Sequence, residues 1–84
     1  MPRYFFHVID GQSFLDQEGT ELPDRGSARN EAVRLAGALL RDDKGTFSDD
    51  HDWRLEVTDG GGLLLFTLHF MTVEAPAAVQ PALT

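Results

Sequence analysis

Only one segment of this 84-residue chain carries apolar residues at helical spacing, and that limits the fold to one long helix. Asp24 is the expected N-cap, with Ser27 as the alternative, and the pattern predicts a helix over Arg25–Arg41. The apolar stripe has spacings of four, three, one and three, at Ala28, Ala32, Leu35, Ala36 and Leu39. We expect four of these side chains to be buried against a sheet: Ala32, Leu35, Ala36 and Leu39.

A first strand pair precedes the helix. Tyr4–Ile9 is rich in aromatic and β-branched residues, which favour a strand with both faces partly covered. The dipeptide Asp10-Gly11 is typical of a tight turn, and Ser13–Leu15 begins the return strand. Gly19 interrupts this strand with a turn or bulge, after which pairing resumes briefly at residues 20–22.

A second strand pair follows the helix. Trp53–Thr58 alternates in polarity, which predicts that Trp53, Leu55 and Val57 face inward. The glycines at 60–62 form the turn, and Leu63–Phe70 returns as the most apolar strand. The fold class is therefore α+β, in the order β-β-α-β-β, with one amphipathic helix packed on a four-stranded sheet made of two hairpins.

The strand order is open at this point. Because the first and fourth strands are the most apolar, we expect them at the centre of a mixed sheet with the spatial order 2-1-4-3. An all-antiparallel order of 2-1-3-4 is the alternative. We expect one domain over residues 1–73 and a flexible C-terminal tail over 74–84, which is rich in Ala and Pro and has no period.

Composition limits the classes of function. The sequence has no cysteine, which excludes disulfides and thiolate catalysis and fits a cytoplasmic protein. Its net charge of −7 repels phosphate backbones and anionic membranes, so we expect no direct nucleic-acid binding. No apolar run is long enough to span a bilayer, and we expect a soluble chain with no membrane partner.

The sheet face away from the helix is the expected partner-binding surface. A single helix covers only one face of a four-stranded sheet, so apolar residues on the other face need another cover. We expect this cover to be a second copy of the chain, in a homodimer. The expected interface residues come from the first and last strands: Phe5, His7, Ile9, Leu63, Leu65, Thr67 and His69. The alternative is that residues 75–83 fold back over this face.

Two clusters are candidates for metal binding, and each has a simpler explanation. The acidic run at 49–52 offers hard oxygen ligands for Mg²⁺ or Ca²⁺, but it lacks the spacing of a calcium loop and is typical of a solvated linker. His7 and His69 would share a face if their strands were neighbours, but no third ligand is fixed by spacing. We expect no metal site and no cofactor.

Catalytic signatures are equally weak. Asp16 and Glu18 form a carboxylate pair, but they fall at an expected turn, where solvation is the simpler interpretation. The glycines at 60–62 precede a strand, whereas a phosphate cradle requires a helix there. The helix arginines Arg29, Arg34 and Arg41 are candidates for contact with an acidic partner or nucleic acid, but in a chain of net charge −7 they are read as a solvated face. We therefore expect no catalytic residue, and nothing argues for an enzyme.

The opening Met-Pro-Arg-Tyr-Phe-Phe-His-Val at 1–8 resembles that of an uncharacterised family of short bacterial proteins, common in alphaproteobacteria. The resemblance continues through Asp16-Gln17-Glu18-Gly19-Thr20-Glu21-Leu22-Pro23-Asp24 and covers about residues 1–73. It implies no activity and no functional residues. A weaker, fold-level likeness is to bacterial antitoxins with a partial RNase H-like fold, which also pack an alanine-rich helix on a small sheet.

These observations together predict a small protein-interaction module with a regulatory or accessory role. The first alternative is an acidic inhibitor or nucleic-acid mimic that blocks a basic groove, as an antitoxin or anti-nuclease would. The second alternative is a small metal-dependent enzyme.

Overall fold

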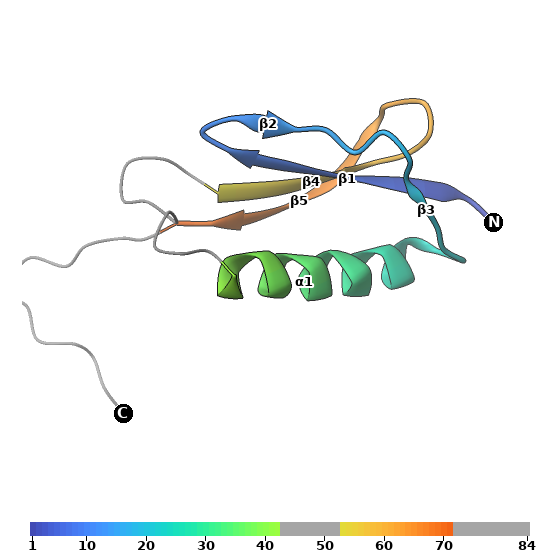
Figure 1. The fold of residues 1–84 in the computed structure, drawn as a ribbon. Coiled ribbons are helices and arrows are strands. Elements are labelled where there is room, and N and C mark those ends of the chain that lie inside the picture. The colour runs from blue at the N-terminus through green and yellow to red at the C-terminus, as the bar shows by residue number, and fades with distance from the viewer. Residues whose placement is uncertain (43–52, 72–84) are drawn as a thin grey trace, which may run out of the picture.

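The computed structural model describes residues 1–42 and 53–71, which form one helix and five strands. The elements in chain order are β1 (Arg3–Asp10), β2 (Ser13–Phe14), β3 (Thr20–Glu21), α1 (Arg25–Arg41), β4 (Trp53–Thr58) and β5 (Leu64–Phe70). Figure 1 shows two layers, with α1 on one face of the sheet. The α+β class is confirmed, and the brief resumption of pairing after Gly19 is the extra strand β3.

The sheet is antiparallel throughout, in the order β2-β1-β4-β5. Strand β3 also pairs with β1, at Arg3 and Tyr4, whereas β2 pairs with it at Val8 and Ile9. The expected mixed order, with β5 beside β1, is therefore wrong, and the all-antiparallel alternative is the observed one. The physical reason is the single helix, which leaves one face of the sheet to water. Antiparallel sheets often have one solvent-exposed face, whereas parallel strands occur mainly in sheets with both faces covered.

The helix begins and ends as the sequence predicts. The carboxylate of Asp24 accepts a hydrogen bond from the Ser27 backbone N–H at 2.8 Å and caps the first turn. Three alanines at a spacing of four are buried: Ala28, Ala32 and Ala36. Because alanine ends at Cβ, this row brings the helix axis close to the sheet.

Two helix positions differ from the expectation. Leu35 is only half-buried, and Leu39 is 39% exposed. The alanine row occupies the line of closest approach to β4, so the larger leucines lie on its flanks. The prediction that Leu39 is buried is therefore wrong, whereas Leu35 packs against the core cluster but is only partly buried.

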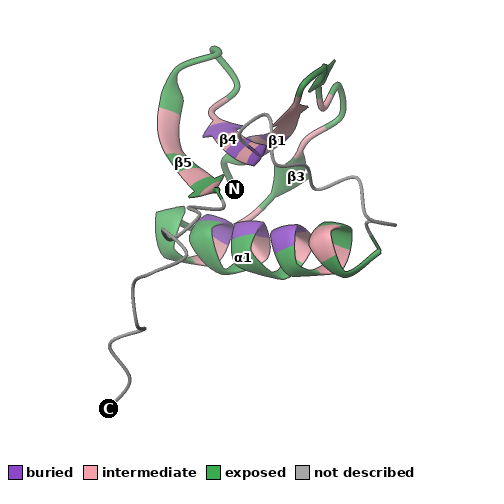
Figure 2. Cartoon of the chain, turned by 90° about the vertical axis from the view of Figure 1, so that its left-hand side faces the viewer, coloured by how far each residue is buried: buried purple, intermediate pink, exposed green. Residues whose placement is uncertain are grey.

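The core lies between α1 and the inner face of the sheet, coloured purple in Figure 2. Trp53, Leu55 and Val57 of β4 are all buried there, as their alternation predicts. Tyr4 and Phe6 of β1 complete the cluster. The Trp53 ring packs edge-on against Phe70 with 5.6 Å between ring centroids. The strand with strict alternation, and not the most apolar strand, is thus the centre of the fold.

Strand β5 contains a bulge that changes its expected alternation. Thr58 lies opposite Leu64 and Val57 lies opposite Phe66, so Leu65 is the extra residue. Leu65 is half-buried and packs against the core cluster, whereas the sequence placed it on the outer face. Leu64 is exposed, although simple alternation with Leu65 on the outer face would turn it inward.

No helix among the described residues is long and apolar enough to cross a membrane. The acidic run at 49–52 and the predicted tail at 74–84 lie outside the described residues.

Candidate functional site

The outer face of the sheet, away from α1, holds most of the predicted partner-binding residues. Phe5, His7 and Ile9 lie side by side along β1 and are half-buried. Thr67 and His69 lie on β5 and are exposed. These two groups do not touch, because β4 runs between β1 and β5.

Strand β4 makes the middle of the outer face polar. Thr58 lies opposite Phe5, Glu56 opposite His7, and Arg54 opposite Ile9. On the other side of β4, Thr67 is paired with Glu56 and His69 with Arg54. The surface is therefore an apolar strip on β1 beside a polar strip on β4, and not one continuous apolar patch.

The two remaining predicted residues lie apart from this face. Leu65 packs against the core cluster, as described above. Leu63 precedes β5 in the turn and is 64% exposed. The structure thus brings together Phe5, His7 and Ile9, with Thr67 and His69 two strands away.

His7 is held by two hydrogen bonds that fix its tautomer. The Asp16 backbone N–H donates to His7 Nδ1 at 3.0 Å, so Nδ1 must be the unprotonated acceptor. Nε2 then carries the proton and donates to Thr58 Oγ1 at 3.0 Å. The ring lies parallel to Phe5, with 6.5 Å between centroids. His7 is therefore a structural link between β1, β4 and the turn at Asp16.

The turn at Asp16 is organised by its carboxylate. Oδ1 accepts hydrogen bonds from the backbone N–H groups of Glu18 and Gly19, each at 3.0 Å, and Oδ2 accepts one from Phe6 at 3.1 Å. Partial burial acts to raise the pKa of Asp16, but the three backbone donors outweigh it and lower that pKa. Asp16 is thus bonded to the backbone, where the sequence suggested a solvated carboxylate. An Asp two and three residues before the bonded amides is the local sign of such a turn.

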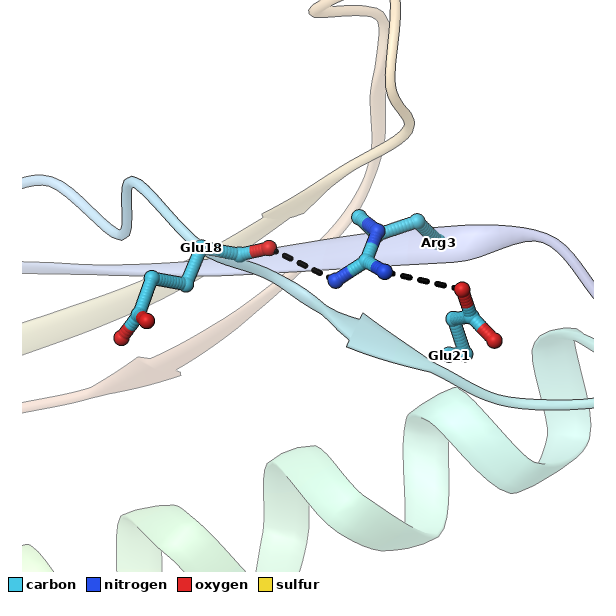
Figure 3. A network of polar contacts seen from close by, with 3 residues as sticks. All are labelled: Arg3, Glu18 and Glu21. Atoms are coloured by element: carbon cyan, nitrogen blue, oxygen red, sulfur yellow. Dashed lines mark hydrogen bonds and ion pairs between the residues drawn. The ribbon is translucent and has the colours of Figure 1, made fainter.

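Gly19 closes the same turn. Its φ is +75°, and a Cβ atom there would lie 2.7 Å from Arg3 Cγ and 2.9 Å from Phe5 Cε2. Arg3 in turn donates to the Glu18 carbonyl and to the Glu21 carboxylate, each at 2.8 Å (Figure 3). The motif Asp16-x-Glu18-Gly19 therefore shapes the edge of the sheet beside β1.

Arg54 and Glu56 form the centre of the polar strip. The Arg54 Nε atom lies 3.6 Å from Glu56 Oε2, and this nitrogen is buried without a hydrogen bond. A buried guanidinium nitrogen without an acceptor is costly, so this pair is the least satisfied polar feature of the outer face.

A second candidate surface lies at the opposite edge of the sheet. A groove of about 450 Å³ runs between the first turns of α1 and β5, lined by Arg25, Gly26, Arg29, Phe66, Thr67 and Leu68. One Arg25 nitrogen donates to the Leu65 carbonyl at 2.7 Å. Sequence reasoning missed this groove because it treated the helix arginines as a solvated face. The available signal was the four-residue spacing of Arg25 and Arg29, which places them on one side of the helix.

The metal hypothesis depended on neighbouring strands for His7 and His69. Those strands are separated by β4, so the two imidazoles do not form the pair that the hypothesis required. Within residues 1–42 and 53–71, no group of three His, Asp or Glu side chains has metal-binding geometry.

Comparison with known proteins identifies the family. A family model described as a domain of unknown function, DUF6894, matches residues 3–72, and the chain belongs to that family. Neither a curated protein nor a solved structure matches the chain.

Proposed function

We propose that this member of the family is a small protein-interaction module with a regulatory or accessory role, which pairs with a second copy of itself through the outer face of the sheet. The observation that carries the proposal is the one-sided layering of the fold. Helix α1 covers the inner face, while Phe5 and Ile9 present apolar side chains on the other. A second sheet packed on this strip would remove it from water.

The polar strip suits a twofold interface. In such an interface the same surface of the two copies is in contact, so a cation of one copy close to the axis can pair with an anion of the other. Arg54 and Glu56 are two residues apart on β4, and both are partly exposed. Pairing across the axis would give the Arg54 guanidinium a second carboxylate beside its long contact with Glu56.

The size of the face sets the expected strength. Strands β1, β4 and β5 have eight, six and seven residues. With a rise of ~3.3 Å and a strand spacing of ~4.8 Å, their flat area is about 300 Å². Stable interfaces bury ~800 Å² on each partner, so we expect a weak dimer that dissociates at low micromolar concentration.

The alternative of an acidic inhibitor requires carboxylates gathered on one surface. In the described part of the chain, six of the nine acidic side chains have separate structural tasks instead. They hold turns, cap the helix or pair with arginine: Asp16, Glu21, Asp24, Glu31, Glu56 and Asp59. This arrangement favours the interaction module, and the likeness to RNase H-like antitoxins stays a prediction. We propose the cytoplasm as its location because a cysteine-free sequence suits a reducing compartment.

Sedimentation of the full chain from low to high micromolar concentration tests the proposal. We expect the mean mass to rise toward that of a dimer, and Ile9→Glu to remove this rise by placing a charge in the apolar strip. Val33→Glu is the matched control, since Val33 is 55% exposed on α1 and away from the sheet. A wild-type chain that stays monomeric at high micromolar concentration, or equal effects of the two variants, would contradict the proposal.

A further inference from the structure

The sheet ends at β5 without a further described strand, whereas β2 and β3 pair with β1 at the other edge. Among the described strands β5 pairs with β4 alone, so its other side has no partner strand. An unpaired edge presents backbone N–H and C=O groups that an extended chain can match. The groove beside α1 lies along this edge and includes Phe66, Thr67 and Leu68.

The arginines of the chain divide into two groups. All six lie within the described residues. Four contact carboxylates of the chain itself: Arg3 with Glu21, Arg34 with Glu31, Arg41 with Asp42 and Arg54 with Glu56. Arg25 and Arg29 have no carboxylate partner among the described residues, and both line the groove. In a chain with a net charge of −7, two cations without anions beside an open edge indicate a site for an anionic partner.

We propose that this groove binds an extended acidic peptide, which adds to β5 as a further strand and places two carboxylates on Arg25 and Arg29. One arm of the Arg25 guanidinium already holds the Leu65 carbonyl, and its remaining N–H groups stay available to a carboxylate. The groove shares only Thr67 with the outer face, and its two arginines lie on α1, so the proposed binding does not depend on self-association.

The spacing of the two arginines defines the peptide. Four helical residues span ~6 Å along the axis. Alternate residues of a strand are ~6.6 Å apart and point to the same side. Because the first turns of α1 and strand β5 line the same groove, an acidic residue, any residue and a second acidic residue would present two carboxylates at about the spacing of the two arginines.

Other occupants fit less well. A second copy of β5 would bring no carboxylate, because Leu64–Phe70 contains no Asp or Glu. A nucleic acid carries a phosphate at every nucleotide, so the net charge of −7 repels it more strongly than a peptide with two carboxylates, and the groove offers it only two arginines.

Fluorescence anisotropy with the full chain tests the proposal, using a labelled Val-Glu-Val-Glu-Val peptide with blocked ends. We expect binding that weakens with salt, and weaker binding of the Val-Gln-Val-Gln-Val peptide. Arg29→Gln should reduce affinity roughly fivefold, as expected for one partly exposed ion pair. Arg34→Gln is the control, because Arg34 pairs with Glu31 and does not line the groove.

Amide chemical shifts locate the bound peptide. We expect the largest changes at Thr67 and its neighbours on β5, since a new strand would bond there. Equal binding of the two peptides, equal affinity of the Arg29→Gln and Arg34→Gln variants, or shifts confined to the outer-face strip of Phe5 and Ile9 would overturn the proposal. Tighter binding of a short single-stranded nucleic acid than of the peptide would also overturn it.

Discussion

The two edges of the sheet differ in how far their polar groups are paired within the chain. Beside β1, short strands β2 and β3 and the turn between them occupy the edge, and the Asp16 carboxylate bonds three backbone amides there. Beside β5 no described strand follows, and Arg29 meets no described carboxylate. Polar groups that the chain satisfies itself hold the fold together. Groups that it leaves unmatched, at a concave edge, are where a partner gains most by binding.

Substitutions at the closed edge, where β2, β3 and the turn between them lie beside β1, should lower the free energy of unfolding most. Gly19 is the most constrained position there. Gly19→Ala should lower the free energy of unfolding by about 2–3 kcal/mol, because a side chain at φ +75° is strained and would also press on Arg3. Gly37→Ala is the control: nothing lies within 4 Å of an added Cβ in this helix position. We expect that change to stabilise by up to ~1 kcal/mol. Urea denaturation of both variants measures the difference, and equal stabilities would contradict the closed-edge assignment.

The Asp16 carboxylate should have the next largest effect. Asp16→Asn replaces one of two accepting oxygens by an NH₂ group that faces a backbone N–H, so we expect a loss of about 1–2 kcal/mol. Asp59 offers a matched comparison, since only its Oδ1 accepts, from the N–H groups of Gly61 and Leu63. An amide oxygen can replace that single acceptor, and Asp59→Asn should change stability by less than ~0.5 kcal/mol. Denaturation midpoints that move equally would show that the turn does not need both oxygens.

The sequence predicts local features of this fold far better than distant ones. The bounds of α1 follow from Asp24 and the apolar period, which are local properties of the chain. The inward residues of β4 follow from simple alternation. The strand order does not, because it depends on which hairpin strand docks beside β1 across a long sequence separation. Apolar content misleads here, since β5 uses its apolar residues at an edge.

The candidate sites show the same limit. The bulge at Leu65 changes the alternation of β5 without any Gly or Pro to mark it. The bond between Asp16 and His7 links a turn to a strand and becomes visible only with the hairpin register in hand. The groove at Arg25 and Arg29 requires the position of α1 relative to β5. Sequence reasoning identified the outer strip of Phe5, His7 and Ile9, but it joined this strip to β5 because it placed the two strands side by side.

Lowering the pH should destabilise the closed edge beside β1, by less than the substitutions of Gly19 and Asp16. The folded pKa of Asp16 is below its ordinary value of 3.8, because the backbone donors outweigh the opposing effect of burial. The resulting stabilisation is therefore complete above pH ~4 and is lost as the pH falls through the folded pKa. Asp24 contributes with the same sign, since its bonds to Ser27 lower its pKa. We expect urea midpoints to fall below pH ~4, and to fall less in Asp16→Asn. An identical pH dependence in the two proteins would exclude this role for Asp16.

Substitution of Arg29 at the β5 edge should change the free energy of unfolding less than the substitutions of Gly19 and Asp16. Arg25 and Arg29 are like charges four residues apart on one helix, an arrangement that costs roughly 0.2–0.5 kcal/mol. Arg29→Gln should therefore leave the free energy of unfolding unchanged or raise it by up to that amount. Arg34→Gln should lower it by a similar amount, because the exposed pair with Glu31 is lost. Opposite signs in the two variants, measured by urea denaturation at low salt, would show that the chain keeps Arg29 at a small cost to its own stability. A loss of more than ~1 kcal/mol in Arg29→Gln would instead make Arg29 part of the closed structure, and the contrast between the edges would fail.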